Sequence, residues 1–476
     1  MGEISDLGVY LPLLRLDRAS AASALRWAGI GGGRTGHRAV AGWDEDALTL
    51  ATEAARPLCA GTARPDDIIF ASTSAPFFDR LQAGLMGDAI GLSQAATTAD
   101  VAGSRRCAVS ALLRAMRAPC AGTTLISAGE KRPTKPGSAA QANWGDGAAA
   151  ATIGAKGFLR LAGHASLHHD LVDFHASREH PTPYAAEERF VRDASVEGVL
   201  APAVRAALAS SGIEPGHIAQ AILPEPVAGT WRALGSALGI KADNFAEPVQ
   251  AAAGDLGAAH PLFALALACE AAKPGDFILL VGFGSGCDAL VLEMTAGPPR
   301  DFGASAALKQ GLALKDYTRF LSLAGGLDLD WGPRSELEQK TAAPVLERYG
   351  RDILGFVGGR DSTGNVQFPK TRLPVSPDAD ASVALVDVRL ADEPARIQSL
   401  TADRLNFSPD PPFHFGLVQF ANGARVLMEF CDVPPGALAV GADVAMRFRI
   451  KSLDRRRGFR TYFWKACPAQ RPALGA

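Results

Sequence analysis

FILLVGFGSGCDALVLEM, residues 277–294, holds two apolar runs on either side of the glycine-rich segment 282–286. Short runs rich in Leu, Val and Ile and bounded by glycine predict two strands, over 277–282 and 289–294. Over the first 295 or so residues, short apolar runs of this kind alternate with helical stretches rich in Ala and Leu, which is typical of an α/β fold. We therefore expect an α/β fold around this hairpin.

The pattern that leads into this hairpin occurs twice along the chain. The strand predicted at 68–72 has a counterpart at 218–223, which begins 150 residues later. The strand predicted at 123–127 has its counterpart at 277–282, which begins 154 residues later. Helical stretches rich in Ala and Leu separate the strands in both copies. A nearly constant offset favours two copies of one α/β unit.

We expect four regions in the chain. The two copies occupy 1–163 and 164–297, a helical linker occupies 298–351, and a β-rich domain occupies 352–476. The β-rich domain contains the runs FGLVQFANGARVLMEF, AVGADVAMRFRI and GFRTYFWKA, which are separated by Gly, Pro, Asp and Asn. Short strands at regular turn spacing predict a small barrel or sandwich.

Asp44, Glu45 and Asp46 precede an apolar helical stretch that reaches Cys59. Acidic residues are favourable near the positive, N-terminal end of a helix. We interpret the three acids as the start of that helix.

The composition is that of a globular protein. The chain has 476 residues, of which 47% are apolar and 21% charged, and the formal net charge is -2. Near-neutral charge gives no basic field for nucleic acid or an anionic membrane, and no apolar stretch approaches the roughly 20 residues that span a bilayer. The seven cysteines are scattered, which is typical of a reducing compartment. The N-terminus carries acids where a signal peptide has basic residues, so we expect a cytoplasmic protein.

Several stretches together resemble the hydroxymethylglutaryl-CoA synthases of the thiolase-like superfamily. They cover about residues 4–295 and read VYLPLLRLDR, GWDEDALTLATEAA, FASTSAP, EKRPTKPG, GDGAAAATIG, GDLGAAHPL and LLVGFGSGCDALVLE. GGRDSTGNVQFPKTRLPVSP, GLVQFANGARVLMEF and YFWKACP resemble an acyl-CoA-associated OB-fold family that carries a zinc ribbon. The resemblance implies a duplicated, five-layer thiolase-like fold, then a helical linker and an OB fold. It also implies a coenzyme A thioester as substrate.

Three positions depart from the synthase pattern. The family's catalytic Glu corresponds to Thr73 and its nucleophilic Cys to Ser104, with a shift of one residue left open. The family's His corresponds to Pro224 or Glu225. All three catalytic roles are therefore altered in this chain.

Ser104 and Cys107 are the candidate nucleophiles, because a helix start lowers a thiol pKa and offers N–H groups to an oxyanion. Ser104 stands at the start of the helix predicted over 104–118, where a simple N-cap is the alternative. Cys107 lies one turn inside, where a buried, inert cysteine is the alternative. The neighbouring Arg105 could bind a carboxylate or a CoA phosphate, or form a salt bridge.

Asp255 and His260 are the candidate acid–base pair. By the resemblance, Asp255 in GDLGAAHPL occupies the position of an active-site Asn in related ketoacyl synthases. A carboxylate there serves as a general base if burial raises its pKa, and the alternative is an N-cap for a helix over 256–271. His260 lies within two turns, with a core or surface histidine as the alternative. We prefer this pair to an acyl-enzyme, because Ser104 has no evident activating base.

Two further positions are candidates for substrate contact. In the resembling family, the turn that holds Gly284 and Ser285 brings backbone amides to the thioester oxygen, and a plain hairpin is the alternative. His175 belongs to a five-histidine segment between the two copies, whose spacing matches no closed zinc motif. We expect His175 either to contact substrate or to lie on the surface.

These observations favour a thiolase-like acyltransferase or lyase. It makes or cleaves a C–C bond beside a CoA thioester or β-keto group, by condensation or retro-Claisen cleavage. The alternative is a catalytically silent scaffold that binds CoA thioesters for a partner thiolase. We expect a homodimer built on 1–295, with an acyl-CoA or β-keto acid as substrate.

The predicted ribbon lacks zinc ligands. The resembling family has two Cys pairs, and their positions here fall near Arg360 and Thr363 and within 373–376. Neither Arg nor Thr replaces a thiolate on zinc. The purified protein should therefore carry no stoichiometric metal, and a chelator should leave its Tm unchanged. About one zinc per chain in elemental analysis would contradict this expectation.

Overall fold

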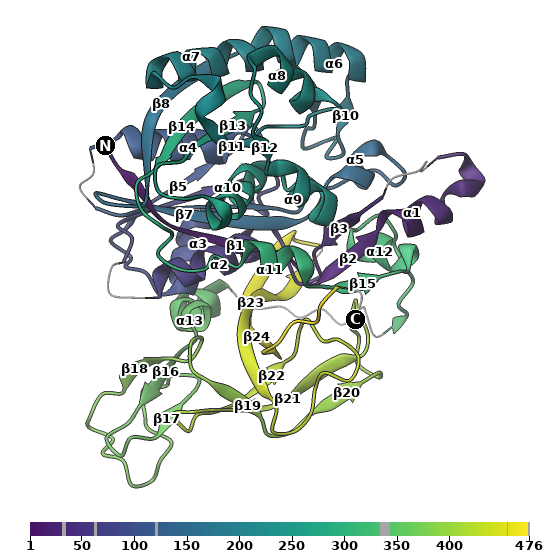
Figure 1. Ribbon diagram of the computed structural model, residues 1–476. Helices are drawn as coiled ribbons and strands as arrows, with labels where there is room; N and C mark the ends of the chain where they lie inside the picture. Colours follow the sequence, from purple (N-terminus) through teal and green to yellow (C-terminus); the bar gives the residue numbers. More distant parts are fainter. Residues whose placement is uncertain (31–34, 61–63, 120–121, 334–342, 455, 475–476) are drawn as a thin grey trace.

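The computed structural model describes residues 1–30, 35–60, 64–119, 122–333, 343–454 and 456–474 (Figure 1). Its N-terminal part is built on a ten-stranded sheet with the order β12-β11-β13-β14-β8-β1-β7-β6-β4-β5. The strands are β1 (Glu3–Tyr10), β4 (Asp67–Ala71), β5 (Thr97–Val101), β6 (Thr124–Glu130), β7 (Gly147–Gly154), β8 (Leu159–His168), β11 (Ile218–Ile222), β12 (Asp243–Asn244), β13 (Phe277–Phe283) and β14 (Gly286–Met294).

The duplication predicted from the sequence is confirmed by the strand order. The first half of the sheet reads β5-β4-β6-β7-β1 and the second reads β12-β11-β13-β14-β8, so equivalent strands take equivalent places. In both halves the first three strands are parallel and the fourth is antiparallel to the third. The halves join where Ile4 of β1 pairs with Leu159 of β8. The expected boundary at residue 163 falls inside β8.

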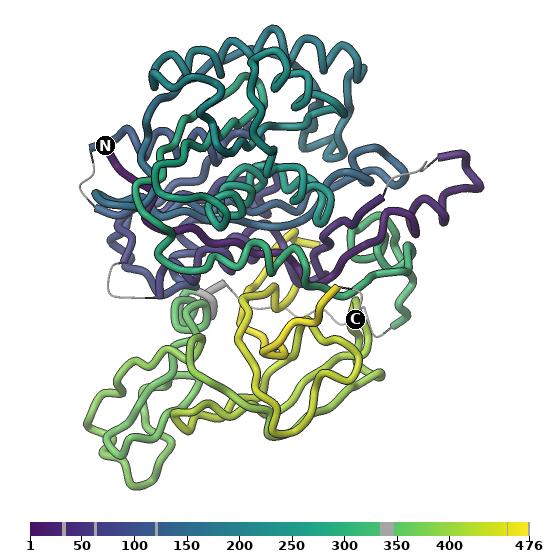
Figure 2. Tube along the Cα trace, in the orientation of Figure 1, coloured from purple at the N-terminus to yellow at the C-terminus, as the bar shows by residue number. Residues whose placement is uncertain are grey.

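Helices cover both faces of the sheet and fill the space between its halves. The outer helices are α2 (Ala47–Ala55) and α3 (Gln82–Ile90) on one side and α7 (Ala201–Ser211) and α8 (Thr230–Leu238) on the other. The central helices are α4 (Cys107–Arg117) and α10 (His260–Ala271), which pack against strands of both halves. The sequence of α10, HPLFALALACEA, is apolar on every side, as a fully surrounded helix requires. This arrangement is the five-layer fold (Figure 2).

Two helices begin later than the sequence predicts. The helix expected from Ser104 begins at Cys107, after a turn, so Cys107 lies at the helix start and not one turn inside it. The helix expected from residue 256 begins at His260, after the short 3-10 turn Gly257–Ala259. In both places the N-terminal turn is tighter or more irregular than an α-helix.

The region after residue 297 is only partly helical. It contains α11 (Ala304–Lys309), α12 (Tyr317–Leu323) and α13 (Ala343–Gly355), while residues 334–342 lie outside the described residues. A strand, β15 (Leu312–Leu314), pairs in parallel with β2 (Leu14–Asp17), and β2 pairs with β3 (His37–Val40). The region predicted as a helical linker therefore also contains a short strand, whose apolar residues complete a small sheet. The remaining elements of the N-terminal part are α1 (Arg18–Ala24), α5 (Ala139–Asn143), β9 (Phe174–His175), β10 (Tyr184–Ala185), α6 (Glu188–Ser195) and α9 (Ala246–Ala253).

The C-terminal domain consists of two sheets. β16 (Val357–Arg360), β17 (Val366–Gln367) and β18 (Val386–Arg389) form the ribbon, and β19 (Ala395–Ile397), β20 (Thr401–Asp403), β21 (Phe413–Phe420), β22 (Arg425–Glu429), β23 (Asp443–Asp454) and β24 (Phe459–Pro468) form the larger sheet. In the ribbon, the Asp361 carboxylate accepts hydrogen bonds from the backbone and hydroxyl of Thr363 and from the backbone of Asn365. The described residues contain no group of three or more side chains placed to hold a metal ion. None of the helices described is both long enough and apolar enough to cross a membrane.

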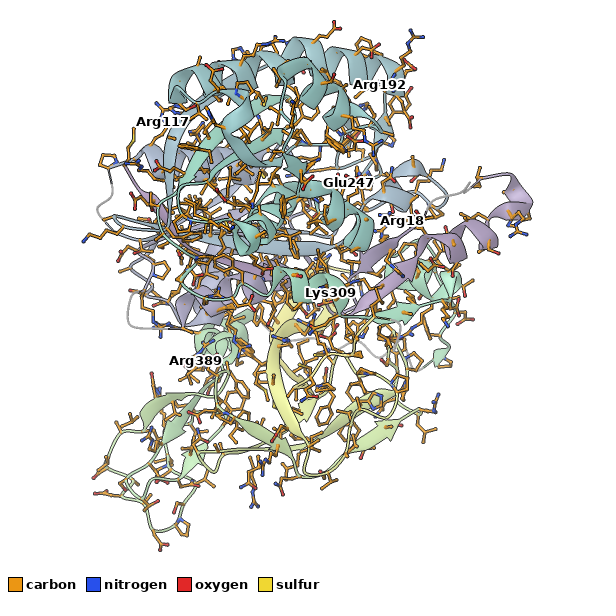
Figure 3. All side chains as sticks on the ribbon, in the orientation of Figure 1. Arg18, Arg117, Arg192, Glu247, Lys309 and Arg389 are labelled. Carbon is orange, nitrogen blue, oxygen red and sulfur yellow. The ribbon has the colours of Figure 1, made fainter. Side chains whose placement is uncertain are left out.

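The C-terminal domain shares a core with the N-terminal part. One buried apolar cluster includes Leu48 of α2 and both Phe448 and Trp464 of the larger sheet. From β18, Arg389 donates to the carbonyl of Ala89 near the end of α3, at 2.8 Å (Figure 3). The two parts therefore pack as one body along α2 and α3.

Ion pairs whose acids are all buried cross the same junction. The acids come from the segment 44–53 and the bases from β23 and β24; the pairs are Asp44–Lys465 (3.0 Å), Glu45–Arg449 (3.0 Å), Asp46–Arg460 (2.9 Å) and Glu53–Arg447 (2.8 Å). Burial acts to raise the pKa of Glu53, but Arg447 and Arg56 outweigh it and hold this pKa below its usual range. The segment predicted as a helix start is thus also the docking surface of the C-terminal domain.

Replacing Arg449 with Met should destabilise the whole chain. Arg449 contacts Glu45, Asp432 at 2.8 Å and the Tyr10 hydroxyl, and its side chain is fully buried. Removing one partner of a buried pair leaves uncompensated charge, so we expect the free energy of unfolding in guanidinium to fall by about 3–5 kcal/mol.

The matched control is Arg396→Met. Arg396 pairs with Asp443 at 2.8 Å, but its side chain is 68% exposed, so its loss should cost about 1 kcal/mol or less. Equal losses for Arg449→Met and Arg396→Met would contradict the importance of the buried junction.

Candidate active site

Four chain segments meet where the central helices α4 and α10 begin. They are the loop after β4, the end of β6, the turn before α4 and the turn before α10. Glu130 links three of them: its carboxylate accepts hydrogen bonds from the Thr73 backbone (2.9 Å), from the Thr73 hydroxyl (2.8 Å) and from the Ala258 backbone (3.3 Å). The hydroxyl of Ser74 donates to the same carboxylate. Glu130 therefore holds Thr73 beside the turn before α10.

Glu130 was missed by the sequence analysis. It is fully buried at the end of β6, directly after an apolar strand. An acid at the end of a buried strand was the available signal, because such a group must find several donors. The Glu130 oxygens accept hydrogen bonds from Thr73, Ser74 and Ala258. Glu130 therefore holds these segments in place and does not act as a proton acceptor for substrate.

Cys107 is poorly suited to be a nucleophile. It is the first residue of α4, but its side chain is only 3% exposed. Burial, with a smaller contribution from the negative charge of Glu130, raises the pKa of the thiol far above its usual range. The helix start therefore does not produce a thiolate here.

The hydroxyl of Ser104 is committed to a structural contact. It donates to the carbonyl of Gly284 at 2.6 Å and lies three residues before α4, so it does not cap that helix. A Cβ on Gly284 would lie 2.5 Å from this hydroxyl oxygen, which explains why glycine is required in the turn. The structure thus brings Ser104 and Gly284 together.

The glycine-rich turn between β13 and β14 is present as predicted. The backbone amide of Gly284 donates to Gly286 at 3.0 Å, so this amide is used inside the turn. Ser285 is exposed with a φ of 46°, and its carbonyl accepts from the Arg106 guanidinium at 3.4 Å. The turn locks the start of α4 to the second half of the sheet.

Arg105 lies between two aromatic rings. Its guanidinium carbon is 4.2 Å from the centre of the Phe174 ring and 5.7 Å from that of Phe283. It also forms an ion pair with Asp173. His175 is exposed, and its ring lies 5.7 Å from that of Tyr184. The structure therefore brings Asp173 and Phe174, rather than His175, to Arg105.

Both ring nitrogens of His260 bind backbone groups. Nδ1 accepts from the Leu256 amide and Nε2 lies 3.2 Å from the Ala246 carbonyl. A neutral imidazole has one donor and one acceptor, so these bonds fix the proton on Nε2. Burial lowers the pKa of His260, although Asp255, 4.0 Å away, opposes this shift.

Asp255 differs from the expectation of a carboxyl with a raised pKa. Burial acts to raise its pKa, but Arg132 and His260 more than offset this, and the pKa lies below its usual range. Asp255 accepts from the Gly257 amide at 2.7 Å, so it caps the short turn and not α10 itself. The group is an ionised carboxylate at neutral pH.

Arg132 was also missed by the sequence analysis. Its side chain is 4% exposed, stacks 3.9 Å from the centre of the Trp144 ring and lies 3.6 Å from the Asp255 carboxylate. Its Nε and Nη1 atoms are buried and have no hydrogen-bond partner among the described residues. The centre of the Trp144 ring in turn lies 5.1 Å from the centre of the Phe174 ring. Arg132 therefore offers unused, desolvated donors beside the carboxylate.

Glu225, at a position where the family resemblance places a histidine, has a structural role. Its carboxylate accepts from the backbone of Gly229 at 2.6 Å and of Trp231 at 2.8 Å, at the start of α8. Burial raises its pKa. These two bonds hold Glu225 at the N-terminal end of α8.

In the folded protein, iodoacetamide at pH 8 should alkylate Cys107 at least about tenfold more slowly than an unstructured cysteine peptide, because only the thiolate reacts. Peptide mass mapping measures the rate, and the same reaction in guanidinium is the control. Rapid alkylation of Cys107 in the native protein would restore it as a nucleophile.

Comparisons with known proteins agree with this architecture. Residues 387–449 match the family "ChsH2, C-terminal OB-fold domain". The hydroxymethylglutaryl-CoA synthase of Aeropyrum pernix is 27% identical over 307 residues, which cover 61% of this chain and 84% of that protein.

Solved structures match over the N-terminal part. An HMG-CoA synthase complexed with CoA has a TM-score of 0.57 at 15% identity, covering 68% of this chain and 90% of that one. The 3-oxoacyl-[acyl-carrier-protein] synthase III of Aquifex aeolicus has a TM-score of 0.52 at 20% identity, covering 62% and 100%. At these identities, the likeness establishes the fold.

Proposed function

We propose an activity for this chain, in which a thiolase-like part related to hydroxymethylglutaryl-CoA synthases is followed by an OB-fold domain. It makes or cleaves a C–C bond beside a CoA thioester or β-keto group without forming an acyl-enzyme. The names of the relatives and the CoA complex of one structural neighbour support the thioester. The altered nucleophile positions and the buried Cys107 support the lack of an acyl-enzyme.

The observation that carries this proposal is that two nitrogens of Arg132, Nε and Nη1, have N–H groups without a partner among the described residues. An arginine does not lose its proton in proteins, so it acts through charge and hydrogen bonds. Donors that are already oriented in a site poor in water stabilise a developing oxyanion strongly. Arg132 would hold the thioester oxygen as it becomes an enolate.

Asp255 is the proposed proton acceptor. Its carboxylate is ionised at neutral pH and so can take a proton, although its lowered pKa makes it a weaker base than the buried carboxyl expected from the sequence. In the cleavage direction, it takes the proton of a water molecule or CoA thiol that attacks the β-carbonyl. The bond between the α- and β-carbons then breaks, and its electron pair passes into the thioester as an enolate. Asp255 returns the proton to the α-carbon. Condensation follows the same steps in reverse.

The remaining candidates take supporting roles in this proposal. His260 is a positioning residue, because its two backbone bonds fix the turn that carries Asp255. Thr73 lines the site from the β4 side, where Glu130 holds it. Arg105, Gly284 and Ser285 support the start of α4, where Ser104 bonds to Gly284, and His175 is exposed.

Assembly and location are part of the proposal. We infer a cytoplasmic homodimer formed through the N-terminal part. β5 supports this inference because it ends the ten-stranded sheet and three of its five residues are exposed. An open strand edge of this kind favours pairing with another chain.

A silent scaffold is the second candidate function. It is favoured by the hydrogen bonds within the site: the polar side-chain atoms of Ser104, Glu130 and His260 all bond to other groups of the protein. In that case the chain binds a CoA thioester and a partner thiolase supplies the nucleophile.

Turnover by two variants tests the proposal. Asp255→Asn should lower turnover by about two to four orders of magnitude, the usual contribution of a positioned proton-transfer group. Arg132→Lys should lower it by about two to three orders of magnitude, as the loss of an oxyanion donor does. Mass spectrometry on a panel of acyl-CoAs and β-keto acids gives both turnover and covalent adducts.

The matched control is Asp193→Asn, an exposed carboxylate on α6, which should leave turnover unchanged. Arg132 also favours the ionised form of Asp255, so its removal raises the Asp255 pKa. In Arg132→Lys, where the charge is retained, the acidic limb of kcat/KM should stay near its wild-type pH. In Arg132→Met the limb should move to higher pH. Normal rates in both Asp255→Asn and Arg132→Lys, or an acyl adduct on Ser104 or Cys107, would overturn the mechanism.

A further inference from the structure

A second polar feature lies at the seam between the two parts of the chain. The loop after β4 begins at Thr73 in the candidate site and reaches Arg80 just before α3. Across the seam stands the hairpin of β23 and β24, which contributes Phe459 and Tyr462. One end of this loop therefore belongs to the site and the other contacts the OB-fold domain.

Arg80 is held between two rings at this seam. Its guanidinium carbon lies 4.9 Å from the centre of the Phe77 ring and 5.2 Å from that of Phe459. The two rings are 6.4 Å apart, and Phe77 is also 6.4 Å from the Tyr462 ring. The aromatic contacts fix the cation in place before any ligand arrives.

Arg80 has an unused donor. Its Nη1 atom is buried and has no hydrogen-bond partner among the described residues. Burial lowers its pKa, and the Tyr462 phenol opposes this shift only in part. A fixed cation with a free donor is suited to an anion.

The surroundings indicate an anion attached to an apolar chain. Phe78 is 74% exposed and Leu81 is 46% exposed. A second guanidinium, that of Arg178, stacks 4.0 Å from the centre of the Phe78 ring. The neighbouring Arg460 is engaged with Asp46 at 2.9 Å, so it does not compete for a ligand. Cations next to exposed apolar side chains match a phosphate that ends a pantetheine arm.

We propose that Arg80 binds the phosphate of the phosphopantetheine group that carries the thioester. This proposal rests on the proposed function, because it assumes a thioester whose arm extends from the candidate site along the loop to Arg80. Phosphopantetheine is shared by CoA and by carrier proteins. The OB-fold domain then takes part in substrate binding, since Phe459 forms one face of the Arg80 site.

Binding of two matched probes to the full-length protein tests the proposal. Calorimetry gives Kd for 4′-phosphopantetheine and for pantetheine, which lacks only the phosphate. We expect the phosphate to tighten binding to the wild type by about 10- to 100-fold, the contribution of one charge-assisted hydrogen bond. In Arg80→Met this ratio should fall to near one, and in Arg80→Lys it should be intermediate.

Arg189→Met is the matched control, because this arginine on α6 is 81% exposed and far along the chain from the seam. It should keep the wild-type ratio. A ratio near one in the wild type, or an unchanged ratio in Arg80→Met, would overturn the proposal. An equal weakening of both probes in Arg80→Met would also overturn it, since that result indicates a structural role only.

Two further probes distinguish the sources of the phosphate. If CoA binds more tightly than 4′-phosphopantetheine, the nucleotide contributes and CoA is the carrier. If a holo-carrier protein binds more tightly than CoA, the arm comes from a carrier protein. These binding measurements do not depend on turnover. If the Asp255 and Arg132 variants leave turnover unchanged, that result therefore overturns the proposed function and not the Arg80 proposal.

Discussion

The structure depends on a set of buried ion pairs between the acids that lead into α2 and the bases of β23 and β24. Asp44, Glu45 and Glu53 pair with Lys465, Arg449 and Arg447 at 2.8–3.0 Å. Charges of this kind are costly to bury and are tolerated only when every partner is present. The thiolase-like part and the OB-fold domain therefore form one body, and the loop after β4 is held between them.

The sequence predicted most of the fold because the fold depends on hydrophobic pattern. The buried strands, the duplicated order and the hairpin at 277–294 were all readable from apolar runs and glycines. The linker is harder to predict, because the apolar residues of β15 fit a helical stretch in the sequence but pair with β2 in a separate sheet. The acids at 44–46 precede a helix, as the sequence predicts, but their bases lie about 400 residues away and no local pattern connects them.

The candidate site was predicted less completely. Family resemblance led to Thr73, Ser104, Asp255 and the turn at 284, and the structure places these around the starts of the central helices. The family resemblance could not show that both ring nitrogens of His260 bond to backbone groups, or that Asp255 has a lowered pKa. Both properties depend on neighbours that are distant in sequence. Arg132 and Glu130 lie in a stretch that the resemblance did cover. Their roles depend on burial and on partners that are distant in sequence. Glu130 binds Thr73, 57 positions earlier, and Arg132 binds Asp255, 123 positions later.

The separation of the paired charges along the chain bears on how the protein is made. Glu53 leaves the ribosome 394 residues before Arg447, its partner. At about 5–20 residues per second, the acids at the start of α2 remain without their bases for about 20–80 s. During synthesis, the α/β part must therefore keep a carboxylate-rich surface hydrated beside apolar side chains that will later be covered. Synthesis of β23 and β24 is the event that supplies the bases and closes this surface.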